Sequence, residues 1–146
     1  MSALSPYIIA IVSAWVIAQG AKYVIAAAKG RSMRNLRYLY LSGNMPSAHS
    51  ATVVALVTVI GLRDGLHSGV FALGALFAAI VMYDAVMVRR SSGEQGAAIQ
   101  QLIKEQKSSI KLPRAAKGHE PAEVMVGAIL GLAIGIAVQV ASVPQI

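Results

Sequence analysis

The sequence contains no cysteine, which excludes disulfide bonds and thiolate metal sites anywhere in the chain. Charged residues are also scarce: they make up 13% of the 146 residues, whereas about 25% is usual for a soluble domain. Hydrophobic residues make up 56%. Neither an internal repeat nor a low-complexity stretch is present. Length and composition together predict a single membrane domain covering residues 1–146.

Four segments come close to the roughly 20 apolar residues that a membrane helix needs. They lie at about 6–28, 46–62, 69–88 and 121–143. No Lys or Arg precedes the first segment and Lys22 lies within it, so we do not expect a cleaved signal peptide. The predicted fold class is therefore all-α, a polytopic bundle of about four transmembrane helices.

The basic residues are concentrated in two loops. Residues 29–45 contain four and residues 89–120 contain seven, so the two loops hold 11 of the 13 Lys and Arg residues. The positive-inside rule then places both loops in the cytoplasm and both chain termini outside the cell membrane. Because these charges have this topological role, the formal net charge of +7 does not indicate nucleic-acid binding.

The second loop has a helical pattern of its own. Ile99, Leu102 and Ile103 fall on one helix face, and Ser92-Gly93-Glu94-Gln95 matches a capping box. We therefore expect a cytoplasmic amphipathic helix that lies on the membrane surface.

Two histidines are expected at the same membrane face. The segments at 46–62 and 121–143 both run outward from the cytoplasm, and His49 and His119 lie at their N-terminal ends. A helix N-terminus offers free backbone N–H groups and the positive end of the helix dipole, which suits an anion. The two histidines therefore mark a candidate site for phosphate chemistry.

The second histidine has a carboxylate at helical spacing. Glu123 follows His119 by four residues, so its carboxylate can accept the Nδ1–H and leave Nε2 free to attack. A dipole-compensating glutamate beside a loop histidine is the simpler alternative. For His49, with Ser47 as N-cap, the alternative is a capping motif whose histidine faces the headgroups.

Further polar residues lie in or beside the apolar segments. Asp84 in the third segment is either a functional carboxylate or the acid of a structural ion pair with Arg89, Arg90 or Lys22. Each arginine could grip phosphate oxygens or anchor the chain at the cytoplasmic surface. Lys22 either snorkels to that surface or points inward at the same anion.

Three groups of residues, in order along nearly the whole chain, carry a family resemblance. They are Asn44-Met45-Pro46-Ser47-Ala48-His49-Ser50-Ala51; then Tyr83-Asp84-Ala85 with Val88-Arg89-Arg90 and Gly93-Glu94-Gln95; and finally Gly118-His119-Glu120-Pro121-Ala122-Glu123-Val124. Together they resemble the divergent branch of the type-2 phosphatidic acid phosphatases. That branch is also described as acid phosphatase or vanadium-dependent haloperoxidase related.

The resemblance implies a metal-independent phosphatase without a cofactor. In the wider superfamily one histidine attacks phosphorus, a carboxylate four residues on holds it, and a second histidine protonates the leaving oxygen. By motif, His119 looks like the nucleophile, Glu123 like its orienting carboxylate and His49 like the general acid. The residues that look like the phosphate-binding set are Ser47, Lys22, Arg89, Arg90 and Asp84.

The sequence departs from the superfamily pattern in several places. The orienting carboxylate is Glu123 instead of the usual Asp, and the arginine expected six residues before the second histidine is missing, with Arg114 five before. The first motif, a Lys with an Arg seven residues later, is represented only by Lys22 with Lys29 or Arg31. Superfamily membrane enzymes commonly have six spans, so a homodimer is one way to enclose a site built on about four.

The expected function is hydrolysis of an inner-leaflet lipid phosphate at the cytoplasmic face. Phosphatidate, phosphatidylglycerophosphate and a prenyl phosphate or diphosphate all meet this description. One alternative is a non-enzymatic protein that binds anionic lipid or transports an anion. Another is a metal-dependent hydrolase with His49, His119, Asp84 and Glu123 as ligands. Membrane lipids are expected partners under each alternative.

Overall fold

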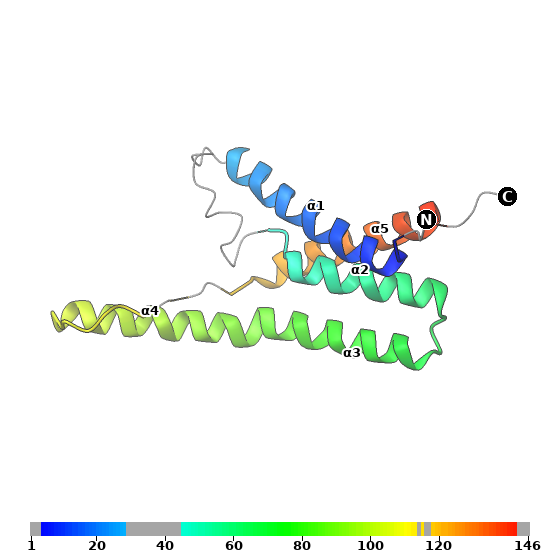
Figure 1. The fold of residues 1–146 in the computed structure, drawn as a ribbon. Coiled ribbons are helices and arrows are strands. Elements are labelled where there is room, and N and C mark those ends of the chain that lie inside the picture. The colour runs from blue at the N-terminus through cyan, green and yellow to red at the C-terminus, as the bar shows by residue number, and fades with distance from the viewer. Residues whose placement is uncertain (1–3, 29–44, 114, 116–117, 143–146) are drawn as a thin grey trace.

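The computed structural model describes residues 4–28, 45–113, 115 and 118–142. All regular structure in these ranges is helical (Figure 1), which confirms the predicted all-α bundle. The elements are α1 (Pro6–Ala28), α2 (Ala48–Arg63), α3 (Gly69–Tyr83), the π-helical turn η2 (Asp84–Val88), α4 (Arg89–Glu105) and α5 (Pro121–Ser142).

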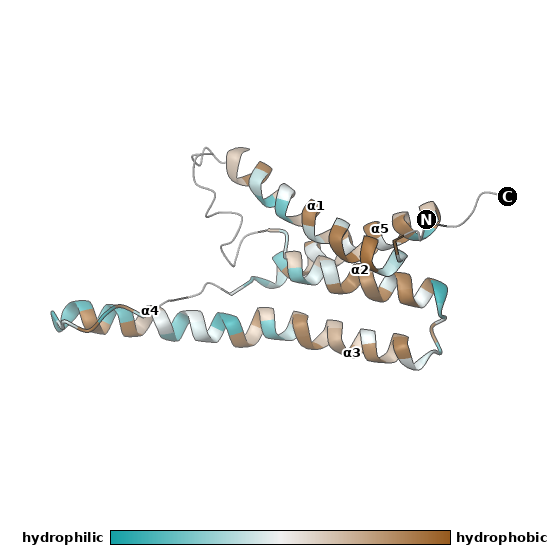
Figure 2. Ribbon diagram, viewed as in Figure 1, coloured by the Kyte–Doolittle hydropathy of each residue, from teal (hydrophilic) through white to brown (hydrophobic). Residues whose placement is uncertain are grey.

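Three of the helices are long and apolar enough to cross a membrane. They are α1, α5 and the continuous helix Gly69–Glu105, while α2 is a shorter apolar helix of 16 residues. Figure 2 shows hydrophobic residues along α1, α3 and α5 and many hydrophilic ones along α4. α2 packs against α1, α3 and α5, so this short helix lies at the centre of the bundle.

The two ends of the bundle gather different parts of the chain. Figure 1 shows the start of α1, the turn between α2 and α3, and the end of α5 at one end. There the Tyr7 hydroxyl donates to the Asp64 carboxylate at 2.8 Å, which joins α1 to the residue after α2. The other end holds the starts of α2 and α5 together with η2. Both histidine segments therefore lie at one end of the bundle.

α2 and α5 run parallel, with their backbones in close contact. Gly127, Gly131 and Gly135 recur every four residues on α5 and are buried. A Cβ at Gly127 would meet the Ser47 backbone, and one at Gly131 would meet the Ala51 backbone. Each contact lies four residues after the previous one in both helices, so α2 and α5 are parallel and in register. Small residues permit this approach between membrane helices, and it fixes the start of α2 beside the start of α5.

The Gly131→Ala variant is expected to be less stable than the wild type. The added Cβ would meet the Ala51 backbone, which cannot rotate away, and overpacking of this kind costs about 1–3 kcal/mol. Gly20→Ala in α1 is the matched control, because nothing lies within 4 Å of its added Cβ. Denaturant midpoints in detergent would compare the two, and a Gly131→Ala protein as stable as Gly20→Ala would contradict the close packing.

The buried face of α1 ends in a lysine. Ala10, Ala14, Ala18 and Lys22 are the buried residues of α1 and are spaced four residues apart. Residues at i and i+4 share a helix face, so Lys22 points in the same direction as the three alanines. The structure therefore directs its side chain into the bundle, where the charge of Glu123 in the first turn of α5 acts on it.

The amphipathic helix is present over Arg89–Glu105, but it is continuous with α3. No side chain caps the start of α4 and no break occurs at Ser92, so the predicted capping box is wrong. No proline interrupts residues 69–105, so the backbone ladder propagates. At 1.5 Å per residue this helix is about 55 Å long, against roughly 30 Å for a hydrocarbon core. α4 therefore extends the axis of α3 instead of forming a separate surface helix.

Candidate active site

His119 and Glu123 form a close pair at the start of α5. The distance from His119 Nδ1 to Glu123 Oε2 is 2.7 Å, and the Glu120 backbone N–H donates to the same oxygen at 3.3 Å. Pro121 begins the helix, which suits a residue that lacks an N–H. An ionised carboxylate can only accept hydrogen bonds, so Nδ1 is the nitrogen that donates, and in the neutral imidazole this leaves the lone pair on Nε2. His119 is 2% exposed, so its ring orientation is fixed by burial as well.

The start of α2 is tied to the same turn of α5. The Ser47 backbone N–H donates to the Glu123 carbonyl at 3.0 Å. Ser47 is the N-cap of α2: its Oγ accepts from the Ser50 backbone N–H at 3.4 Å and from the Ser50 hydroxyl at 2.9 Å. Both serines are fully buried. The Ser47 side chain thus has a capping role, and its contact with phosphate stays a prediction.

His49 lies in the first turn of α2 and is exposed. The charges of Arg89, Lys22 and Asp84 act on its imidazole, and so does His119. These groups come from α1, the η2–α4 junction and the segment before α5. The structure therefore brings the sequence-predicted residues of four chain segments within electrostatic range of one another.

Lys22 brings a buried cation to this group. Its side chain is 8% exposed, and Glu123 is the charged residue that acts on it. Among the described residues, no carboxylate lies within salt-bridge distance of its ammonium group. A buried charge is costly unless it is paired. The ammonium of Lys22 is therefore suited to an anionic ligand.

The two arginines have separate carboxylate partners. Arg89 Nε lies 2.6 Å from Asp84 Oδ2, and Arg90 Nε lies 3.1 Å from Glu94 Oε1. All four side chains are more than one third exposed. Within the described part of the chain these contacts engage Nε, which leaves the terminal NH2 groups of each guanidinium for another acceptor. The ion pair predicted from the sequence for Asp84 is thus present, and its partner is Arg89. Arg31 and Arg114, the other arginines considered from the sequence, lie outside the described residues.

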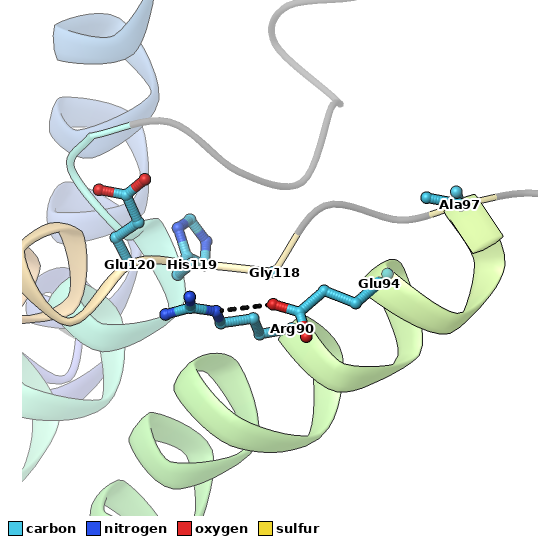
Figure 3. Close-up of a pocket in the computed structure, with 8 residues that line it drawn as sticks. Arg90, Glu94, Ala97, Gly118, His119 and Glu120 are labelled. Carbon is cyan, nitrogen blue, oxygen red and sulfur yellow. Dashed lines mark hydrogen bonds and ion pairs between the residues drawn. The ribbon is translucent and has the colours of Figure 1, made fainter.

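A cavity of about 400 Å³ opens beside His119. Figure 3 shows Arg90 reaching from α4 towards the His119 segment while bonded to Glu94. The residues that line the cavity are Arg90, Gly93, Glu94, Ala97, Ala115, Gly118, His119 and Glu120. Sequence reasoning did not single out Ala97 and Ala115, because alanine carries no chemical signal of its own, whereas Gly93 and Gly118 entered through the family motifs. His119 and Arg90 are the sequence-predicted site residues that line this cavity.

The metal-ligand set considered from the sequence does not assemble. Across residues 4–28, 45–113, 115 and 118–142, no three His, Asp or Glu side chains come together as a metal site. Asp84 is engaged by Arg89, and Glu123 by His119. The arrangement instead combines a hydrogen-bonded imidazole, a second imidazole and several cations, a set suited to an oxyanion.

The fold and this site describe a helical membrane protein with a candidate oxyanion site at one end of the bundle. Residues 4–134 match the family described as the Divergent PAP2 family, so the chain belongs to that family, as its motifs predicted. It is also similar to the "Uncharacterized membrane protein YuiD" of Bacillus subtilis (strain 168). The two are 40% identical over 106 residues, which is 62% of this chain and 67% of that protein. No solved structure matches the chain.

Proposed function

We propose that this protein is a metal-independent membrane phosphatase that hydrolyses a lipid phosphate through a phosphohistidine. The observation that carries the proposal is the buried His119, whose Nδ1 is held 2.7 Å from Glu123 at the end of the bundle where the charge of Lys22 acts on His49. Anion binding needs positive charge alone. An oriented, neutral imidazole is what nucleophilic attack requires.

The proposed reaction has two steps. In the first, the Nε2 lone pair of His119 attacks phosphorus, the P–O bond to the lipid alcohol breaks, and protonated His49 gives its proton to the leaving oxygen. In the second, a water oxygen attacks phosphorus while His49 takes a proton from that water, and the P–N bond breaks. Inorganic phosphate leaves, His119 regains its lone pair, and His49 is protonated again.

Positive charge for the phosphoryl oxygens comes from Lys22, Arg89 and Arg90. Stabilising and positioning these oxygens is most of what phosphoryl transfer demands. The backbone N–H groups at the start of α2 add donors from a fixed position. We assign Ser47 the task of holding that helix start, since its hydroxyl caps α2. The 400 Å³ cavity beside His119 provides room for a substituted phosphate.

The substrate class follows from the topology. With 11 of 13 basic residues in the two predicted cytoplasmic loops, the site faces the cytoplasm. The substrate phosphate then belongs to a lipid of the inner leaflet, such as phosphatidate, phosphatidylglycerophosphate or a prenyl phosphate or diphosphate. Three apolar helices of spanning length support a multi-pass membrane location.

Phosphate release from a panel of these lipids, by purified protein in detergent, tests the proposal. We expect release from at least one lipid, and we expect it to continue in the presence of a chelator. Loss of release with chelator, restored by a divalent ion, would point to the metal-dependent alternative. Binding of lipid phosphate with no release from any substrate would favour the anion-binding alternative, which the buried charge of Lys22 also fits.

The His49→Ala variant is expected to lower kcat by about 10²- to 10⁴-fold, because a general acid contributes this much to proton transfer. KM should change little, since the cations that bind phosphate remain. In kcat/KM, which reports the first step alone, an aryl phosphate should lose much less than a lipid phosphate, because its phenolate leaves without a proton. His67→Ala is the matched control, because that histidine is exposed in the turn between α2 and α3. An equal loss of kcat/KM for alkyl and aryl substrates would exclude a general-acid role for His49.

A further inference from the structure

The π-helical turn η2 meets the segment that carries His119. We propose that the backbone of this turn positions the His119 imidazole by binding the segment that carries it. We further propose that Asp84 is a positioning residue, which holds the turn in its π-helical form. The catalytic consequence rests on the proposed phosphatase function, whereas the positioning itself is measurable without turnover.

The backbone of the turn supplies the acceptor. In an α-helix the N–H of Arg89 would bond to the carbonyl of Ala85, four residues earlier. Here it bonds to the carbonyl of Asp84, five residues earlier, as a π-helix requires. The Ala85 carbonyl instead accepts the His119 backbone N–H at 3.1 Å. The π turn thereby provides a backbone acceptor for the residue that carries the imidazole.

The side chains of the same two residues reinforce the turn. Asp84 Oδ2 accepts from Arg89 Nε at 2.6 Å, alongside the backbone bond between the same residues. On an α-helix the facing neighbours are three and four residues apart, not five. The ion pair of Asp84 and Arg89 is therefore suited to the widened turn and favours it over a regular α-helix.

A second contact joins the His119 segment to the helix just beyond the turn. A Cβ added at Gly118 would meet the backbone of Arg90. Gly118 therefore lies directly against the helix, and the residue before the imidazole is docked as well as hydrogen-bonded. Together with Glu123, which holds Nδ1, these contacts fix His119 through both its backbone and its side chain.

This assigns Asp84 a role other than phosphate binding. Its carboxylate is occupied by Arg89 and would repel the anionic substrate. Loss of the carboxylate should loosen the turn, withdraw the Ala85 carbonyl and shift His119 from the line of attack. A misplacement of about 1 Å can cost roughly 10²-fold in rate.

The first test is Asp84→Asn, which keeps the side-chain shape and removes the charge. We expect kcat to fall by about 10- to 100-fold with KM within about threefold, because the phosphate-binding cations remain. Glu105→Gln, at the far end of α4, removes an exposed carboxylate that accepts from Gln101 and should leave both constants unchanged. A raised KM with unchanged kcat would overturn the proposal and place Asp84 and Arg89 in phosphate binding.

The second test needs no turnover. Deletion of the exposed Met87 removes the extra residue of the π turn and lets α3 and α4 join as a regular α-helix. In ¹⁵N-histidine-labelled protein we expect both the deletion and Asp84→Asn to shift the His119 imidazole nitrogens, while Glu105→Gln leaves them in place. If both variants keep the wild-type nitrogen shifts, the turn does not position His119. If the wild-type protein releases no phosphate, the proposed function is refuted. The chemical shifts of the His119 nitrogens would then still decide whether the turn positions the imidazole.

Discussion

Replacing His119 with alanine is expected to abolish phosphate release. The variant lacks the Nε2 lone pair that attacks phosphorus, and loss of a catalytic nucleophile commonly costs at least about 10⁴-fold in kcat. Lys22, Arg89 and Arg90 remain, so lipid phosphate should still bind. The measurement is phosphate release beside equilibrium binding of the same lipid, with circular dichroism to establish that the helices are intact.

Added imidazole provides the control for this variant. His119 lines a cavity of about 400 Å³, which has room for a free imidazole molecule. We expect imidazole to restore part of the turnover in His119→Ala and none in a His49→Ala, His119→Ala double variant. Normal phosphate release from His119→Ala without added imidazole would contradict the assignment of His119 as nucleophile.

Replacing Glu123 with glutamine is expected to have the second largest effect. The amide is nearly isosteric, but it carries no charge to stabilise the imidazole as the P–N bond forms, and its NH2 group can turn towards Nδ1 and select the wrong tautomer. By analogy with the carboxylate of a serine-protease triad, kcat should fall by up to about 10⁴-fold. Phosphate release and lipid binding should be measured together, with Glu105→Gln as the control.

The Glu123→Gln result also separates the two functions that the site could have. Lipid binding should persist and even tighten, because a negative charge that acts on Lys22 is removed from the anion site. A pure anion-binding protein would show this change in affinity and nothing else. Unchanged turnover with unchanged binding would show that the 2.7 Å pair between His119 and Glu123 has no catalytic role.

Much of the arrangement could be predicted from the sequence because it depends on local spacing. The apolar runs predicted the helices, and the distribution of Lys and Arg placed His49 and His119 at the same end of the bundle. The four-residue interval between His119 and Glu123 predicted that the two side chains would meet. Each of these features depends on one or two helical turns, which a linear pattern specifies.

Other features depend on tertiary packing and leave no comparable pattern. The continuity of α3 with α4 was missed because Ser92 matches a capping box, yet the helix already begins at Gly69 and needs no cap there. The π turn was missed because one extra residue in a helix has no compositional signature. The burial of Ser47 follows from the close approach of α2 to Gly127, which only the packed bundle reveals.

The most direct measurement is detection of phosphate on His119 during turnover. Wild-type protein would be mixed with the lipid that it hydrolyses, quenched in base within one turnover, digested and examined by mass spectrometry. We expect phosphate on His119 in the wild type. With an aryl phosphate as substrate, we expect a higher phosphohistidine occupancy in His49→Ala, because the phosphohistidine then forms without a general acid while its hydrolysis lacks the base. Turnover without phosphate on His119 in either protein, under conditions that preserve a synthetic phosphohistidine peptide, would contradict the phosphohistidine mechanism.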